Sequence, residues 1–118
     1  MSEYKSEGKP PMELLSPEFL KEISYVLEFG NNKHIENHYT DGVLVSKVLG
    51  SAIRHIFELM EGDIDHETGR HLAAHAAAAL QIIFTLTTDP RYKEFDDRFS
   101  TKTGSSLGRR SNIPKQNI

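Results

Sequence analysis

The stretch HLAAHAAAALQIIFTLTTD, residues 71–89, decides the fold. Six of the seven residues from 73 to 79 are alanine, which has the highest helix propensity and a side chain of one methyl group. Small side chains let neighbouring helices approach closely, so we predict a central helix that starts near His66 or Glu67 and ends at about Thr87. Its bulky apolar residues surround much of the circumference, which predicts burial on more than one side; they are Ile82, Ile83, Phe84 and Leu86.

Two further helices are predicted before this one. Ser16-Pro17-Glu18 combines a hydroxyl cap, a proline at the first helical position and an acid in the first turn, and Gly30 is expected to end the helix. A polar loop over 31–42 leads to a second helix, over 43–61. Its predicted inner stripe consists of Val45, Val48, Leu49, Ala52, Ile53, Ile56 and Met60.

These helices predict an all-α fold. Asp89-Pro90 stops the central helix and starts a short fourth one that reaches Phe95 or Phe99, and no β-type alternation is sustained anywhere. We expect a small bundle of three to four helices over residues 16–100, after an N-terminal arm over 1–15. Because so few helices make a thin core, we expect a homo-oligomer to complete the bundle.

The composition excludes several classes of protein. The chain has 118 residues and no cysteine, which fits one domain without disulfides or thiolate metal sites. No apolar run approaches the ~20 residues that span a bilayer, and the N-terminus has no apolar signal segment, so a cytoplasmic protein without membrane contact is expected.

Charge is divided unevenly along the chain. The formal net charge is −3, and residues 101–118 contain four cations and no acid, so the remainder carries −7. An acidic body argues against an extended nucleic-acid-binding face. Residues 101–118 are otherwise polar and are predicted to form a flexible basic tail.

Candidate metal ligands gather between positions 55 and 75, which contain four of the six histidines and several acids. His71 and His75 are four residues apart and would share one face of the predicted helix, and His55 would meet them across a helical hairpin. A site rich in carboxylates suits Mg²⁺ or Mn²⁺, whereas one rich in histidine suits Zn²⁺ or Fe²⁺. The candidate ligands are His55, Glu58, Glu61, Asp65, His71 and His75.

Each of these residues also has a purely structural interpretation. The acids can form a solvated helix end, with Asp65 or His66 capping the third helix. Three cations of the body can bind phosphate or form surface ion pairs, namely Lys33, Arg54 and Arg70.

The order and spacing of several short motifs resemble a known family. The motifs, between residues 7 and 85, are Gly8-Lys9-Pro10, Val26-Leu27-Glu28-Phe29-Gly30, Lys33, Arg54-His55, Gly62-Asp63, Asp65, Glu67-Thr68-Gly69 and His75-Ala76. They resemble the N-terminal domain of phage dATP/dGTP diphosphohydrolases, distantly similar to the all-α nucleotide pyrophosphohydrolases. Those enzymes carry E-x-x-E on one helix and E-x-x-D on the next. Glu58-x-x-Glu61 matches the first half, but His71 and His75 stand in place of the second pair of acids.

The resemblance implies a metal-dependent pyrophosphohydrolase, phage-encoded and acting in the host cytoplasm, that releases pyrophosphate from purine deoxynucleoside triphosphates. Mg²⁺ or Mn²⁺ would be the cofactor, and Asp63, Asp65 and Glu67 would be the catalytic acids. Lys33, His38, Arg54 and Arg70 would contact the nucleotide. The alternative is an inactive helical module that binds or sequesters a nucleotide or a host protein.

Overall fold

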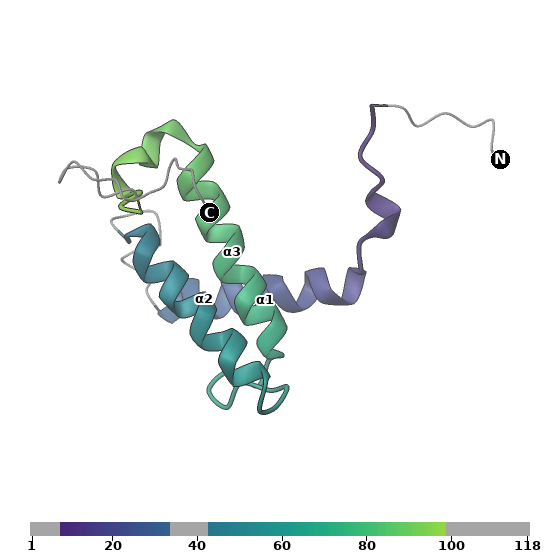
Figure 1. Cartoon of the computed structure of the whole chain (residues 1–118). Helices are drawn as coiled ribbons and strands as arrows, with labels where there is room; N and C mark the ends of the chain where they lie inside the picture. Colours follow the sequence, from purple (N-terminus) through teal and green to yellow (C-terminus); the bar gives the residue numbers. More distant parts are fainter. Residues whose placement is uncertain (1–7, 34–42, 99–118) are drawn as a thin grey trace, which may run out of the picture.

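The computed structural model describes residues 8–33 and 43–98, which form three α-helices and two short 3-10 helices (Figure 1). In chain order they are η1 (Met12–Leu14), α1 (Pro17–Lys33), α2 (Val45–Leu59), α3 (Leu72–Thr88) and η2 (Pro90–Phe95). Within these two ranges the only extended pairing is one isolated bridge, between Ile64 and His71. The all-α prediction is therefore confirmed. The predicted basic tail, and residues 1–7 of the predicted arm, lie outside the described residues.

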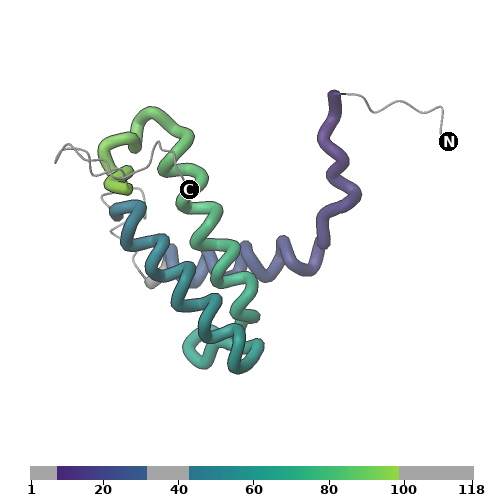
Figure 2. Tube along the Cα trace, viewed as in Figure 1, coloured from purple at the N-terminus to yellow at the C-terminus, as the bar shows by residue number. Residues whose placement is uncertain are grey.

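The helices α2 and α3 form an antiparallel hairpin, and α1 crosses it on one side (Figure 2). The first half of α1, together with η1, extends away from the hairpin. No helix in the described ranges is long and apolar enough to cross a membrane.

The core consists of two clusters that share α3. On one side of α3, the buried residues Val45, Val48 and Ala52 of α2 pack against Ala79, Ile83 and Leu86. On another side, Val26 of α1 packs against Ala74 and Ala78. Alanine side chains on both sides let α1 and α2 approach the backbone of α3, so the prediction of a central third helix is confirmed.

Glycine did not end the first helix as predicted. α1 continues through Gly30 to Lys33. A glycine ends a helix when it adopts the left-handed conformation, but Gly8 and Gly69 are the described glycines with positive φ. Gly30 keeps a negative φ, so the helix continues through it.

The predicted start of the third helix was also wrong. α3 begins at Leu72, and its N-cap is His71, whose Nδ1 accepts a hydrogen bond from the backbone N–H of Ala73. Neither Asp65 nor His66 caps the helix. His71 therefore has an extended backbone and does not share a helical face with His75, contrary to the prediction.

The predicted inner stripe of α2 is buried only in its first half. Val45, Val48 and Ala52 are buried, but Ile53, Ile56 and Met60 are 45–77% exposed. The fourth helix is the 3-10 helix η2, capped by the side chain of Asp89.

Replacing Leu86, which is fully buried between α2 and α3, tests this core. We expect Leu86→Ala to lower the free energy of unfolding by about 2–5 kcal/mol, because it removes apolar contacts and leaves a cavity. The matched control is Leu14→Ala, since Leu14 is 79% exposed and should change stability very little. Urea denaturation followed by circular dichroism measures both. Equal losses in the two variants would contradict the assignment of the core.

Candidate functional site

The connector between α2 and α3 folds into a closed loop. The N–H of Asp65 donates to the carbonyl of Arg70 (2.9 Å), and the N–H of Leu72 donates to the carbonyl of Asp63 (2.6 Å). The N–H of Gly69 donates to the carbonyl of Asp65 (2.8 Å), and Gly69 itself has φ of +74°, where glycine is favoured. These bonds fix the shape of the loop over residues 63–72.

The carboxylate of Asp65 organises the interior of this loop. Its Oδ2 accepts hydrogen bonds from the backbone N–H groups of Glu67 (3.0 Å) and Thr68 (2.8 Å) and from the Thr68 hydroxyl (3.0 Å). No described residue donates to its Oδ1. Within the described residues, one oxygen of Asp65 therefore makes all of the carboxylate's hydrogen bonds that hold the loop.

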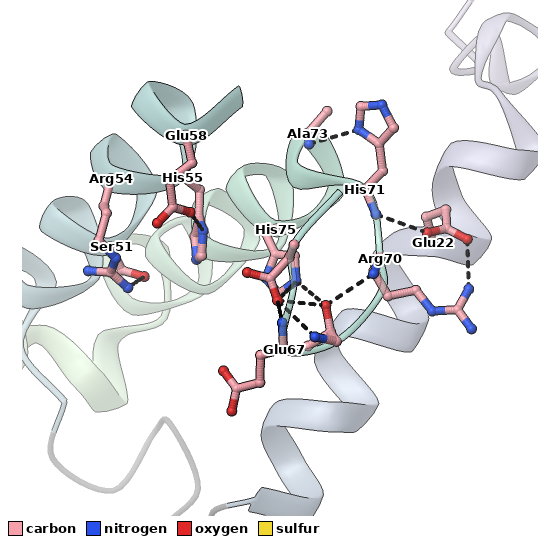
Figure 3. A network of polar contacts seen from close by, with 12 residues as sticks. Glu22, Ser51, Arg54, His55, Glu58, Glu67, Arg70, His71, Ala73 and His75 are labelled. Carbon is pink, nitrogen blue, oxygen red and sulfur yellow. Dashed lines mark hydrogen bonds and ion pairs between the residues drawn. The ribbon is translucent and has the colours of Figure 1, made fainter. Parts of the chain in front are cut away.

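Three of the predicted metal ligands converge at this loop. Each of His55, Glu58 and Asp65 offers one ligand atom, and the three atoms lie within 4.8 Å of one another. His55 Nδ1 is 3.2 Å from Glu58 Oε1, one turn along α2. This metal-site group therefore joins α2 to the connector, and Figure 3 shows its two α2 residues, His55 and Glu58.

His75 on α3 lies beside the metal-site group. Its ring centroid is 4.7 Å from that of His55, and its Nε2 is 3.6 Å from Asp65 Oδ2 and 2.7 Å from the Thr68 hydroxyl. Figure 3 shows His75 between the connector and His55. The site thus draws on α2, the connector and α3.

The hydroxyl of Thr68 determines the tautomer of His75. It has a single proton, and a carboxylate can only accept, so the hydroxyl donates to Asp65 and accepts from the N–H of Arg70 (3.1 Å). The short contact with His75 must then use a proton on Nε2 of the imidazole. The neutral ring consequently carries its lone pair on Nδ1.

The pKa values of Asp65 and His75 are both lowered. Burial opposes ionisation of Asp65, but the hydrogen bonds from Thr68 and Glu67 and the nearby His75 outweigh it, so its pKa falls. Burial lowers the pKa of His75, and the attraction of Asp65 offsets this only in part. The structure therefore favours an ionised carboxylate beside a neutral imidazole, the forms that bind metal ions.

The chemistry of these donors fits a divalent cation. Two carboxylates and one imidazole make a mixed oxygen and nitrogen set that suits Mg²⁺ or Mn²⁺ and also accepts Zn²⁺. The side chain of Glu58 is 45% exposed, which leaves the group open to solvent on one side. That opening allows a phosphate or water ligand to reach the group.

Other predicted ligands lie outside the metal-site group. Glu61 and Asp63 are exposed, and Asp63 contributes a backbone carbonyl to the loop. Glu67 is exposed, and its charge raises the proton affinity of His75. The Nδ1 of His71 is occupied by the cap of α3.

The two described arginines among the predicted phosphate contacts lie in different surroundings. Arg70 forms an ion pair with Glu22 (2.8 Å), and its guanidinium lies 4.3 Å from the ring centroid of Tyr25. Arg54 is exposed and lies near Ser51 on α2, next to His55 (Figure 3). The side chain of Lys33 and the whole of His38 are outside the described residues.

Three residues of this region were not predicted to contribute. Thr68 connects Asp65 to His75, and its only signal was its place in the Glu67-Thr68-Gly69 motif. Glu22 and Tyr25 of α1 hold Arg70, 48 and 45 positions away along the chain, and no local pattern indicates this contact.

Comparison with known proteins identifies the family. Residues 2–98 match the sequence profile described as "dATP/dGTP diphosphohydrolase, N-terminal". The chain belongs to this family. A protein of Salmonella phage PMBT28 named "dATP/dGTP diphosphohydrolase" is 40% identical to this family member over 81 residues, which is 68% of the chain. The match covers 28% of the phage protein, so the chain spans less than a third of its relative's length. No solved structure matches the chain.

The lowered pKa of His75 predicts how the stability of the metal-free protein depends on pH. The unfolded chain binds a proton at histidine below pH ~6.5, before folded His75 does. Stability should therefore be highest above this pH and fall as the pH drops through the folded pKa. Melting temperatures between pH 7.5 and 5, measured with a chelator present, should fall less steeply for His75→Gln.

The control for this measurement is His66→Gln, which removes an exposed histidine from the same connector. A pH profile of His66→Gln that is shallower than that of His75→Gln would contradict the placement of His75.

Proposed function

We propose that this chain binds a divalent cation at His55, Glu58 and Asp65 and acts on purine deoxynucleoside triphosphates, releasing pyrophosphate in the host cytoplasm. The convergence of these three side chains carries the proposal. Membership of the family and the printed name of the phage relative support the choice of substrate.

The metal-site group would hold Mg²⁺ or Mn²⁺ through Glu58, the free Oδ1 of Asp65 and the imidazole of His55. An ion held there would neutralise charge on the phosphate oxygens and lower the pKa of bound water. Asp65 suits this role because its Oδ2 is already fixed by three hydrogen bonds. It therefore loses little side-chain freedom when a ligand binds.

His75 would orient the group and would not be its main ligand. Its Nε2–H donates to the Thr68 hydroxyl, which in turn donates to Asp65. These two hydrogen bonds fix the position of the imidazole of His75 relative to the carboxylate of Asp65. Among the other predicted catalytic acids, Glu67 lies close enough to His75 to influence its charge. We assign Glu67 a water-orienting role, and we assign Asp63 a supporting role through its backbone carbonyl.

Arg54 would contact the triphosphate. It is exposed and directly precedes His55 on α2. Arg70 is better suited to a structural role, because Glu22 and Tyr25 already hold its guanidinium against α1. The sequence predicted a phosphate contact for both arginines, but only Arg54 keeps that role in this proposal, and Arg70 has a structural one.

A second candidate is a domain that binds the nucleotide and does not hydrolyse it. It is favoured by α3, which presents His75 where the distantly similar all-α pyrophosphohydrolases have acids. Under this proposal the metal-site group would still anchor the triphosphate through a cation.

Turnover separates the two candidates. The full chain should convert dATP and dGTP to the monophosphates and pyrophosphate when Mg²⁺ or Mn²⁺ is present, with dCTP and dTTP as comparison substrates. Asp65→Asn should abolish turnover, because it keeps the shape of the side chain but removes its charge. Nucleotide-dependent thermal stabilisation without product would establish the binding domain instead. Neither product nor stabilisation with any nucleotide would remove both candidates.

Metal affinity can be tested apart from nucleotides. Titration calorimetry with Mn²⁺ should show at least a tenfold loss of affinity in Glu58→Gln and in Asp65→Asn, because each removes a charged ligand. Asp65→Asn should stay folded, since an amide oxygen can still accept the loop N–H bonds. The matched controls are Glu61→Gln and Asp63→Asn, which remove the same charges from neighbouring exposed positions outside the group. Equal affinity in all five proteins would exclude the site.

A further inference from the structure

We propose that the side of the α2–α3 hairpin that faces away from the metal-site group is an interface between two copies of this chain. We call this surface the outer hairpin face. It is made by Ile53, Ile56, Phe57 and Met60 of α2 and by Leu80 and Phe84 of α3.

Helix geometry places both rows of residues on the same side. His55 and His75 lie 4.7 Å apart, so they mark one side of the hairpin. Ile53 and Phe57 are each two residues from His55, which is about 200° around α2. Phe84 is nine residues from His75, about 180° around α3. Both rows therefore point to the opposite side from the metal-site group.

The outer hairpin face is uncovered in the single chain. Phe57 is 63% exposed, Phe84 is 66% exposed and Met60 is 77% exposed. α1 does not cover them, because it packs against Ala74 and Ala78, on another side of α3. In Figure 1, α1 passes behind the hairpin.

Neither helix row of this surface contains a charged residue, and one carboxylate reaches its edge, that of Asp97, which accepts hydrogen bonds from Ser46 at the start of α2 (2.6 and 2.9 Å). The other residues at these helix angles are also neutral: Ser46, Leu49 and Gly50 on α2, and Ala73, Ala77, Gln81 and Thr88 on α3. Charged residues make up 26% of the chain, yet none falls on these two rows. Solvated helix faces normally carry charged and polar side chains, so this surface is better suited to contact with protein than with water.

A second copy is the occupant that this surface fits. In a two-fold dimer the same face meets itself, and helix rows without charged residues produce no like-charge repulsion at its centre. Its bulky residues, such as Phe57 and Met60, can pack over the small side chains of Ala73 and Ala77 on the other copy. Two hairpins that meet in this way form a four-helix bundle, which supplies the layer that the thin core lacks.

The available area agrees with a dimer of ordinary size. A phenylalanine side chain buries roughly 200 Å², so Phe57 and Phe84 alone expose about 250 Å². That is about a third of the ~800 Å² that each partner buries in a standard interface. The four aliphatic side chains, each at least 45% exposed, supply much of the remainder.

Other segments of the chain match this face less well. Residues 101–118 carry four cations and three large apolar residues, Leu107, Ile113 and Ile118. The projecting part of α1 and η1 also exposes apolar side chains, but Glu13, Glu18 and Lys21 are interspersed among them. The outer hairpin face is the surface on which large apolar side chains occur without charges.

Sedimentation and light scattering of the full chain test the proposal. The wild type should have twice the mass of the 13.3 kDa chain. Phe57→Glu and Phe84→Glu should each raise the dimer dissociation constant at least about 30-fold, the loss expected for a central interface residue. Leu14→Glu is the matched control, because it introduces the same charge in place of an exposed apolar residue on η1.

Two measurements show whether a loss of the dimer in Phe57→Glu comes from unfolding or from damage to the metal-site group. Circular dichroism should show that Phe57→Glu keeps its helices, since Phe57 contributes nothing to the core. Mn²⁺ affinity should be equal in wild type and Phe57→Glu, because the metal-site group is on the other side of the hairpin. Loss of the dimer is therefore independent of the proposed activity.

Three results would overturn the proposal. The first is a wild-type chain that is monomeric at every concentration. The second is a dimer that Leu14→Glu dissociates and Phe57→Glu leaves intact, which would place the interface on the α1 arm. The third is a monomeric chain that Phe57→Glu strongly destabilises, which would mean that another segment of the same chain covers the face.

Discussion

The structure of the candidate site depends on one carboxylate oxygen, Oδ2 of Asp65. It accepts two backbone hydrogen bonds and one from the Thr68 hydroxyl. These bonds hold residues 65–68 in a turn outside the helix, and α3 starts at Leu72 and not at the predicted His66 or Glu67. The same oxygen sets the position of Thr68, and Thr68 in turn holds the Nε2–H of His75. Loop shape, helix start and histidine tautomer therefore share one cause.

The second constraint is the small size of the side chains on α3. Alanines on two sides let α1 and α2 pack against it at once, with Ala74 and Ala78 facing one and Ala79 facing the other. This close packing gives little stabilising free energy, because each alanine buries only a small apolar area. Several large apolar residues of α2 and α3, including Phe57 and Phe84, remain on the outer hairpin face. The thin core and the proposed dimer interface are thus two consequences of the same composition.

The candidate site and the proposed interface are on opposite sides of the hairpin, so the two can function at the same time. A two-fold dimer would leave both metal-site groups open to solvent, each near an exposed Arg54. The Arg70–Glu22 pair ties α1 to the connector beside the site. The backbone N–H of Asp65 donates to the carbonyl of Arg70, so Asp65 lies in the same loop as this ion pair.

The sequence by itself determined the helical content and the central place of α3, and it indicated the region of the candidate site. These features arise from local preferences, such as alanine propensity and apolar spacing, that act within a few residues. The clustering of His55, Glu58 and Asp65 followed from their nearness to a single hairpin turn. The resemblance added the family, which the comparisons confirmed.

Only the tertiary structure decided which of these residues meet. Helical spacing predicted that His71 and His75 share one face of a helix. In the structure, His71 is the N-cap of α3, and His75 lies beside His55. The sequence predicted too much burial for the second half of α2. Apolar spacing shows which residues share a face of the helix, but it does not show whether another helix packs on that face. The contact of Arg70 with Glu22 joins residues 48 positions apart. Such contacts depend on how helices pack, and packing is set by long-range geometry that no local pattern contains.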